Sequence, residues 1–406
     1  MYKGRLMAMM FLEFFIWGAW YTTIAVYMTQ HGMADLTHWP YTVNPIAAIV
    51  APFFLGLVAD RYFSTEKVLG VLHLLGGVVM LIVPQATGSP TAFISLLLLY
   101  NLCYMPTIGL ANSISFHHIE DQEKQFPLIR VFGTIGWIVA GLAISFGLPQ
   151  FTSDLPEKTP LTLYMTGVAS ILLGLYSFTL PHTPPPAAGE KVSMRSILGL
   201  DALKQLSSRP FYIYLLSSFL ICIPLAAYYN FTQIFLESAG FTKIAGTQTL
   251  GQMSEVIFMV LMPFFFARLG VKWMLFTGMA AWALRYALFS VGAPDAVFWM
   301  IITGILLHGV CYDFFFVTGQ IYVDKKANPG IRAQAQGLNV LVTYGLGLGI
   351  GAQIVGWLRN EIIDLSSADV LSQFGTFWLL PAIFAVAIMV MFAVLFKEKA
   401  TNAVKG

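Results

Sequence analysis

Leu98-Leu99-Tyr100-Asn101-Leu102-Cys103-Tyr104 has a counterpart 208 residues later, in Leu306-Leu307-His308-Gly309-Val310-Cys311-Tyr312. Two shorter matches follow the same order at nearly the same spacing: Pro52-Phe53-Phe54 with Pro263-Phe264-Phe265, and Ile129-Arg130 with Ile331-Arg332. Each match is short, but together they indicate an internal repeat of about half the chain. We therefore expect two similar halves.

The composition is that of a membrane protein. Of the 406 residues, 57% are hydrophobic and only 10% are charged, whereas a soluble domain has about 25% charged residues. This excludes a soluble enzyme, and a net charge of +2 provides no basic surface for a nucleic acid. Cys103, Cys222 and Cys311 lie in apolar runs without the spacing of a metal site or a disulfide framework, so no metal is expected.

Long apolar runs recur twelve times along the chain. A spanning helix needs about 20 apolar residues, whereas a barrel strand needs only about 10 alternating ones. We predict an all-α polytopic membrane protein with twelve transmembrane helices, near residues 7–30, 41–60, 66–84, 91–116, 127–148, 161–181, 210–237, 245–268, 271–291, 296–323, 331–358 and 374–397. Six is an even number, so the two six-helix repeats are parallel.

The distribution of Lys and Arg predicts the orientation. With a cytoplasmic N-terminus, eighteen of these residues lie in cytoplasmic segments and three, Lys158, Lys243 and Arg359, lie outside. The positive-inside rule then places both termini in the cytoplasm. The longest connection, 182–209, is expected to be a cytoplasmic linker between six-helix bundles over 1–181 and 210–406.

The loop after the second predicted helix carries a candidate gating motif. It reads Gly56-Leu57-Val58-Ala59-Asp60-Arg61. Major facilitator transporters have Gly-x-x-x-Asp-Arg/Lys at this place, and their parallel six-helix repeats resemble the plan predicted here. Asp60 and Arg61 are candidates for a latch that breaks and reforms as the halves rock. The alternative is an ordinary capped, charged helix end.

Four ionisable residues lie well inside predicted spans: Glu13, Glu255, Arg285 and Asp313. Each costs about 2.5–3.5 kcal/mol at the bilayer centre when unpaired, so each must be paired, protonated or beside water. Glu255 lies three residues after Gln252, and both face the same way. We expect Glu255 to carry a proton or contact substrate; the alternative is a protonated carboxyl that bonds a neighbouring helix. Arg285 is expected to pair with a buried carboxyl.

Two polar stripes suit a ring-bearing polar substrate. Arg130, Thr134 and Trp137 share one helix face, although Arg130 alone could instead reach the lipid headgroups. His308 and Tyr312 share a face of another helix, while Asp313 is turned about 100° away and is a candidate for proton coupling or a buried ion pair. Aromatic residues such as Tyr229, and Trp17 and Trp20 beside Glu13, could stack on a base or a sugar. They are equally common in helix packing.

The glycine-rich run Tyr344-Gly345-Leu346-Gly347-Leu348-Gly349-Ile350-Gly351 has a different interpretation. It lies inside an apolar span and contains no Lys, so it is not a phosphate loop. Small residues at this spacing allow two helices to approach closely. We predict a helix-packing face.

Several segments resemble the bacterial nucleoside:proton symporter family of the major facilitator superfamily. They include Phe126-Pro127-Leu128-Ile129-Arg130-Val131-Phe132-Gly133-Thr134, Gln252-Met253-Ser254-Glu255, Tyr312-Asp313-Phe314-Phe315 and Ile331-Arg332-Ala333-Gln334-Ala335-Gln336-Gly337. The resemblance runs end to end. It implies a nucleoside-binding site at Arg130, Thr134, Gln252 and Glu255, with aromatic positions at Trp137, His308 and Tyr312. The chain departs from the characterised permeases at Ala226 and Tyr229, where they have Gln and Asn, and at His308, where they have Tyr.

These observations predict a proton-coupled importer of nucleosides or nucleoside-like solutes, working by alternating access in the bacterial inner membrane. The predicted substrate-binding residues are Arg130, Thr134, Trp137, Tyr229, Gln252, Glu255, His308 and Tyr312, with Glu255 or Asp313 as the proton carrier. No Gly-x-x-x-x-Gly-Lys motif is present, so protons, and no cofactor, are expected to supply the energy. The alternative is a proton-coupled sugar or glycoside permease, because the two amides of the seventh helix are lost. An enzyme is not expected, and by analogy with major facilitators we expect a monomer.

Overall fold

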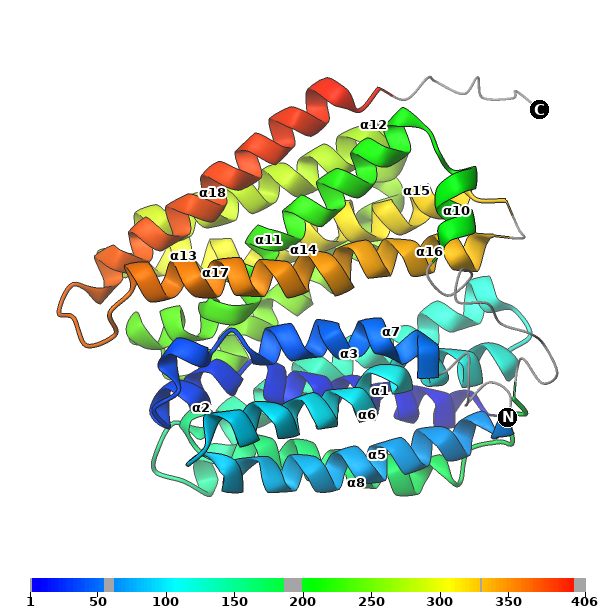
Figure 1. Cartoon of the computed structure of the whole chain (residues 1–406), viewed down its shortest axis with the longest axis horizontal. Coiled ribbons are helices and arrows are strands. Elements are labelled where there is room, and N and C mark those ends of the chain that lie inside the picture. The colour runs from blue at the N-terminus through cyan, green and yellow to red at the C-terminus, as the bar shows by residue number, and fades with distance from the viewer. Residues whose placement is uncertain (1, 55–61, 186–198, 329–330, 398–406) are drawn as a thin grey trace.

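The computed structural model describes residues 2–54, 62–185, 199–328 and 331–397, and the regular elements in these ranges are helices. The helices run roughly side by side in two groups: those coloured blue to blue-green form one group, and those from green to red form the other (Figure 1). Asp60 and Arg61, the predicted gating residues, lie outside the described residues.

The first group contains the helices before residue 181. Its members are α1 (Lys3–Tyr21), α2 (Ile24–Gln30), α3 (Pro40–Phe54), α5 (Thr65–Ile82), α6 (Pro90–His117), α7 (Gln122–Leu142) and α8 (Leu161–Ser177). α1 packs on α7 and α8, and α5 packs on α6 and α8. One face of α5 exposes Val71, Leu75, Val78 and Ile82 at helical spacing, as expected for a surface in contact with lipid.

The second group contains the helices after residue 199. Its members are α10 (Leu200–Gln205), α11 (Arg209–Ser238), α12 (Ile244–Gly292), α13 (Phe298–Leu306), α14 (His308–Tyr312), α15 (Thr318–Lys326), α16 (Arg332–Val340), α17 (Leu348–Ile362) and α18 (Val370–Leu395). Two π-helical turns, η7 (Asp313–Val317) and η8 (Leu341–Gly347), interrupt this group, and such turns are frequent at functional sites. α12 has two arms separated at Gly270, whose φ of 64° and ψ of 178° break the helix between the predicted spans 245–268 and 271–291.

Within the described residues, nine helical segments are long and apolar enough to cross a membrane. They are Lys3–Gln30, Thr65–Ala86, Pro90–His117, Gln125–Gln150, Arg209–Ser238, Ile244–Gly292, Phe298–Lys326, Gln334–Ile362 and Val370–Leu395. The predicted helix 161–181 is shorter than expected and ends at Ser177, because a turn closed by the Thr179 and Leu180 amides follows it. The predicted helix 41–60 is described as far as Phe54.

The glycine-rich run brings helices of both groups together, which confirms the predicted packing face. A Cβ on Gly345 would lie 2.8 Å from Ile49 of α3, and one on Gly347 would lie 2.8 Å from Cys222 of α11. Gly349 and Gly351 repeat the two contacts one turn later, against Pro45 and Ile223. Because small residues alternate between the two sides, η8 and α17 fit closely between α3 and α11.

The two groups also meet where α7 lies along the first arm of α12. Within the first group, α7 lies very close to α1, since a Cβ on Gly136 would collide with the carbonyl oxygen of Phe11. This close approach positions the polar stripe of α7 beside the aromatic residues of α1. The candidate site lies at this meeting of the two groups.

Candidate functional site

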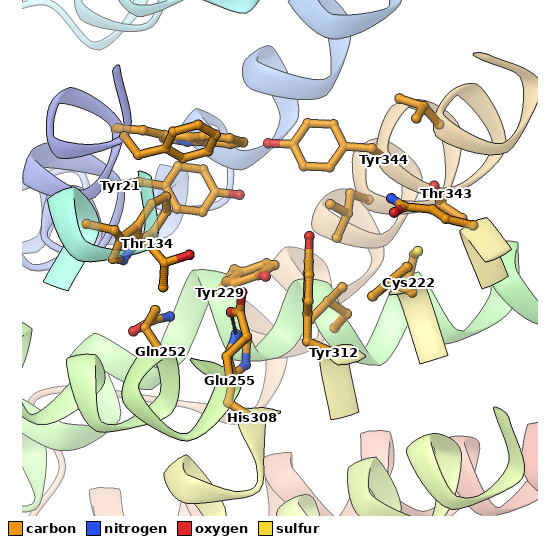
Figure 2. A pocket seen from close by; sticks show the side chains of 18 of the residues that line it. Tyr21, Thr134, Cys222, Tyr229, Gln252, Glu255, His308, Tyr312, Thr343 and Tyr344 are labelled. Atoms are coloured by element: carbon orange, nitrogen blue, oxygen red, sulfur yellow. Dashed lines mark ion pairs between the residues drawn. The ribbon is translucent and has the colours of Figure 1, made fainter. Parts of the chain in front are cut away.

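One cavity of about 230 Å³ lies between the two groups of helices. Its walls come from α1 and α7 on one side and, on the other, from α11, α12 and the helical segments from α14 to α17 (Figure 2). The eight substrate-binding residues predicted from the sequence all line it: Arg130, Thr134, Trp137, Tyr229, Gln252, Glu255, His308 and Tyr312. Helical spacing and the family resemblance together selected these residues, although spacing alone did not show that their helix faces would meet.

The α7 stripe is held by contacts with α1. The guanidinium of Arg130 lies 4.0 Å from the centre of the Phe14 ring, a cation–π contact, and lines the cavity. Trp137 packs edge-on against Trp17, with ring centres 5.5 Å apart. Gly18 makes this possible, because a Cβ there would lie 3.0 Å from the Trp137 ring. The two helices thus present a cation, a hydroxyl and two indoles to one space.

A close contact between α12 and α14 brings Glu255 and His308 together. Glu255 Oε2 lies 3.9 Å from His308 Nε2 (Figure 2). Ser254 Oγ donates to the carbonyl of Leu306 at 2.6 Å and accepts from the amide of Gly309 at 2.9 Å, so it bridges the break between α13 and α14. Gly309 lacks a side chain at the point where the backbone of Ser254 approaches. The carboxyl and the imidazole are therefore positioned by backbone contacts.

Two aromatic residues that were not predicted to belong to the site complete the wall. Tyr21 packs against Tyr229, with ring centres 5.7 Å apart, and Tyr344 packs against Trp17 at 6.0 Å. Tyr344 also donates to Asn44 Oδ1 at 2.6 Å. Tyr21 lies one helical turn after Trp17, so its spacing was a usable signal. Tyr344 lies in the glycine-rich run, where no signal pointed to a cavity.

Asp313 lies apart from the residues that line the cavity. It is fully buried at the start of η7, and neither carboxyl oxygen has a hydrogen-bond partner among the described residues. As expected from the turn of the helix between the two residues, Tyr312 lines the cavity and Asp313 does not.

The predicted carboxyl partner of Arg285 is wrong for the described part of the chain. Its guanidinium lies 4.0 Å from the centre of the Tyr228 ring, and its Nε donates to the carbonyl of Gly304 at 2.9 Å. Tyr228 also stacks on His308, with ring centres 5.4 Å apart. A ring face and a backbone oxygen stabilise this cation in place of an ion pair.

Glu13 is paired, as its position inside a span required. His73 Nε2 lies 2.9 Å from one carboxyl oxygen, and Thr107 donates to the other at 2.6 Å. Trp17, one turn later, lines the cavity, whereas Trp20 is buried against Tyr100. The predicted stripe of α1 therefore contributes only Trp17 to the site.

Comparisons with known proteins agree along the whole chain. The family model described as "Nucleoside H+ symporter" matches residues 1–401. YegT of Escherichia coli (strain K12) is 41% identical over 402 residues, which cover 97% of this chain and 94% of YegT. The xanthosine permease of the same organism is 32% identical, over 97% of this chain and 95% of the permease.

A solved structure supports the same fold. The crystal structure of the nucleoside transporter NupG superposes with a TM-score of 0.85 and 30% identity, covering 98% of this chain and 99% of NupG. The nucleoside permease NupG of Escherichia coli (strain K12) is 30% identical over 421 residues, across 100% of this chain and 98% of the permease.

Proposed function

The chain belongs to the nucleoside H+ symporter family, and we propose that it imports nucleosides together with protons through the cavity between its two groups of helices. The observation that carries this proposal is the convergence of the eight predicted residues on one cavity with walls from both groups. A site shared by two repeats can be exposed to each side of the membrane in turn as the repeats rock. The protein is a transporter, not an enzyme.

The polar residues of the cavity suit a nucleoside. Arg130 and Gln252 lie on opposite walls and offer donors, and Gln252 Oε1 is a buried acceptor that no described residue bonds. Trp17, Trp137 and Tyr229 provide flat faces for a base or a ribose. Thr134, His308 and Tyr312 supply further hydrogen-bonding groups around the substrate.

Glu255 and Asp313 are the two acidic residues assigned to proton transport. Glu255 lines the cavity, and the charge of Arg130 acts on it, so protonation of Glu255 and substrate binding share one space. Asp313 is buried about one helical turn after Gly309, the residue of α14 that contacts Ser254 of α12, and its charge interacts with that of Glu255. Glu255 is the carboxyl that loads a proton with the substrate, and Asp313 is the second acidic group of the pathway.

The proposed topology combines the helices of both groups with the orientation that the positive-inside rule predicts. The two arms of α12, the shorter helices α3 and α8, and the remaining long segments provide twelve crossings with both termini in the cytoplasm. The bundles comprise 1–181 and 210–406, joined by the cytoplasmic linker 182–209. The protein works as a monomer in the bacterial inner membrane.

Uptake of labelled uridine and adenosine into proteoliposomes tests this function. With an inward proton gradient, we expect accumulation that a protonophore abolishes and that excess sugar leaves unchanged. Glu255→Gln is expected to reduce accumulation to the level reached without a gradient. Glu361→Gln is the matched control, because Glu361 is exposed at the end of α17.

Counterflow of labelled against unlabelled uridine separates the roles of Glu255. Exchange retained in Glu255→Gln, with accumulation lost, assigns the carboxyl to proton coupling alone. If the variant loses exchange as well as accumulation, Glu255 also contacts the substrate. Uptake that sugars abolish, or no nucleoside uptake by the intact protein, refutes the nucleoside assignment and favours a sugar permease.

A further inference from the structure

Among the described residues, several hydrogen bonds and ion pairs between the two groups of helices lie at one end of the molecule. Gln233 of α11 accepts from the amide of Ala25, and Gln353 of α17 donates to Thr42. Arg359 lies 3.3 Å from Asp35, and Lys158 lies 2.6 Å from Glu237. In the proposed topology this end faces the outside, and we call these contacts the outer contact.

The first turn of α12 is capped by the other group of helices. The first amides of a helix have no partner within it, so a side chain or water must accept from them. Here Glu157 Oε1 accepts from the amide of Ala245 at 3.1 Å, and Ser145 Oγ accepts from the amide of Gly246 at 2.8 Å. Both acceptors belong to the segment between α7 and α8. If the groups separate at this end, α12 loses both caps.

Glu157 is an unusual cap, because it is fully buried. Its second carboxyl oxygen is buried as well, and no described residue bonds it. An ionised carboxylate in this position leaves a charged oxygen without water or a donor, and that is costly. A protonated carboxyl avoids the charge and keeps the bond from Ala245.

We propose that Glu157 is a further proton-binding site, separate from the cavity and from Asp313, and that a proton taken up there from the outside favours closure of the outer contact. The proton binds as the contact closes and returns to the outside when the contact opens, so it is distinct from the transported proton. This proposal rests on the topology in the proposed function.

The surroundings of Glu157 agree with this assignment. Burial is the main cause that raises its pKa, the charge of Glu237 adds to it, and the bond from Ala245 opposes it without cancelling it. η6 (Pro156–Lys158) packs against α2, α8 and η4 (Ala143–Gly147). The titratable groups at this end of the packed elements are Tyr27 of α2, His31 directly after α2, Tyr164 of α8, the adjacent Lys158, Glu237 of α11 and Lys243 before α12; η4 has none.

The direction of the pH effect follows from these contacts. An exposed Glu has a pKa of about 4.3. The closed contact raises the pKa of Glu157, so protonation of Glu157 favours closure. This effect is largest at a pH below the pKa of an exposed Glu, and it is lost as the pH rises through the raised pKa of Glu157 in the closed contact.

His38, also in the outer contact, acts in the opposite direction. Its ring lies where a Cβ on Gly356 of α17 would be. Burial, with the charge of Arg359, lowers the pKa of His38 from 6.5 to about 4. The closed contact therefore releases the proton of His38, and this residue opposes closure as the pH falls from 6.5 toward 4.

The distance between spin labels at Ser153→Cys and Thr242→Cys, both exposed at the outer end, tests the proposal. The full chain, with its three native cysteines replaced, is measured without substrate between about pH 4.5 and 8. Comparing His38→Gln with His38→Gln/Glu157→Gln isolates Glu157, because the cavity carboxyls are the same in both.

We expect acidification to shift His38→Gln toward the short distance and the double variant to lose at least half of that shift. Ser145→Ala in the same background weakens the cap without removing a titratable group, so it should keep the pH response. An equal shift with and without Glu157, or a shift that disappears in Glu237→Gln instead, overturns the proposal. Uridine uptake is measured in parallel: its absence with an intact pH response refutes only the nucleoside assignment.

Discussion

Glu13 and His73 form a buried pair that joins four helices of the first group, and it offers a demanding test of the structure. Glu13 Oε2 on α1 lies 2.9 Å from His73 Nε2 on α5, and Glu13 Oε1 accepts from Thr107 of α6 at 2.6 Å. On the far side of the imidazole, His73 Nδ1 lies 3.0 Å from Ser170 Oγ of α8. Both Glu13 and His73 are at most 1% exposed.

Hydrogen bonds hold the imidazole of His73 on both sides. The hydroxyl of Ser170 donates to the carbonyl of His73, so His73 Nδ1 donates to Ser170 Oγ. On its other side, His73 Nε2 forms a second buried hydrogen bond with Glu13 Oε2. Removing one member leaves the other buried without its partner.

The expected magnitudes follow from this accounting. Glu13→Leu or His73→Leu alone should each destabilise the protein by about 3–5 kcal/mol, because a buried polar or charged group remains unpaired. The double variant should recover most of that loss, because no group is left unpaired and burying an ion pair is itself costly. With about 2–4 °C per kcal/mol, each single variant should melt on the order of 10 °C lower.

Thermal unfolding of the purified protein in detergent, followed by fluorescence, measures these effects. The double-mutant cycle should give a coupling of at least about 2 kcal/mol. Single variants that melt within about 2 °C of the wild-type protein contradict the reasoning. So does a double variant that is no more stable than the worse single one.

Three further predictions concern other parts of the structure. Gly136→Ala should destabilise the protein by about 1–3 kcal/mol, because the added Cβ would collide with the Phe11 carbonyl. Gly4→Ala is the control and should have little effect, because a Cβ there meets nothing within 4 Å. Equal melting temperatures of the two variants would contradict the close approach of α1 and α7. Arg130→Lys keeps the charge but loses the planar contact with Phe14, so the KM for uridine uptake should rise about tenfold or more, and an unchanged KM would place Arg130 outside the binding site. The pKa of His38 is lowered to about 4 by burial, so the folded protein should lose stability as the pH falls from 6.5 toward 4, and His38→Gln should flatten this part of the melting profile; an unchanged profile would refute the role of His38.

Features that depend on composition or on the period of a single helix could be predicted from the sequence. Apolar runs identified a membrane protein, and the repeat around Tyr104 and Tyr312 predicted two halves. Arg130, Thr134 and Trp137, spaced by one turn, had to share a face, and the same reasoning joined His308 to Tyr312. Each stripe was correct because the helical period is a local property of the backbone.

Which helix faces meet depends on the tertiary structure. His73 lies 60 residues from Glu13, and no spacing in the chain indicates their pairing. The expected carboxyl partner of Arg285 was wrong, because a helix can bring a cation against a ring face, here Tyr228, as readily as against a carboxylate. Glu157 caps a helix of the opposite group, which depends on how the halves pack. The period of a helix determines the direction of a side chain, but the packing of whole helices determines what that side chain contacts.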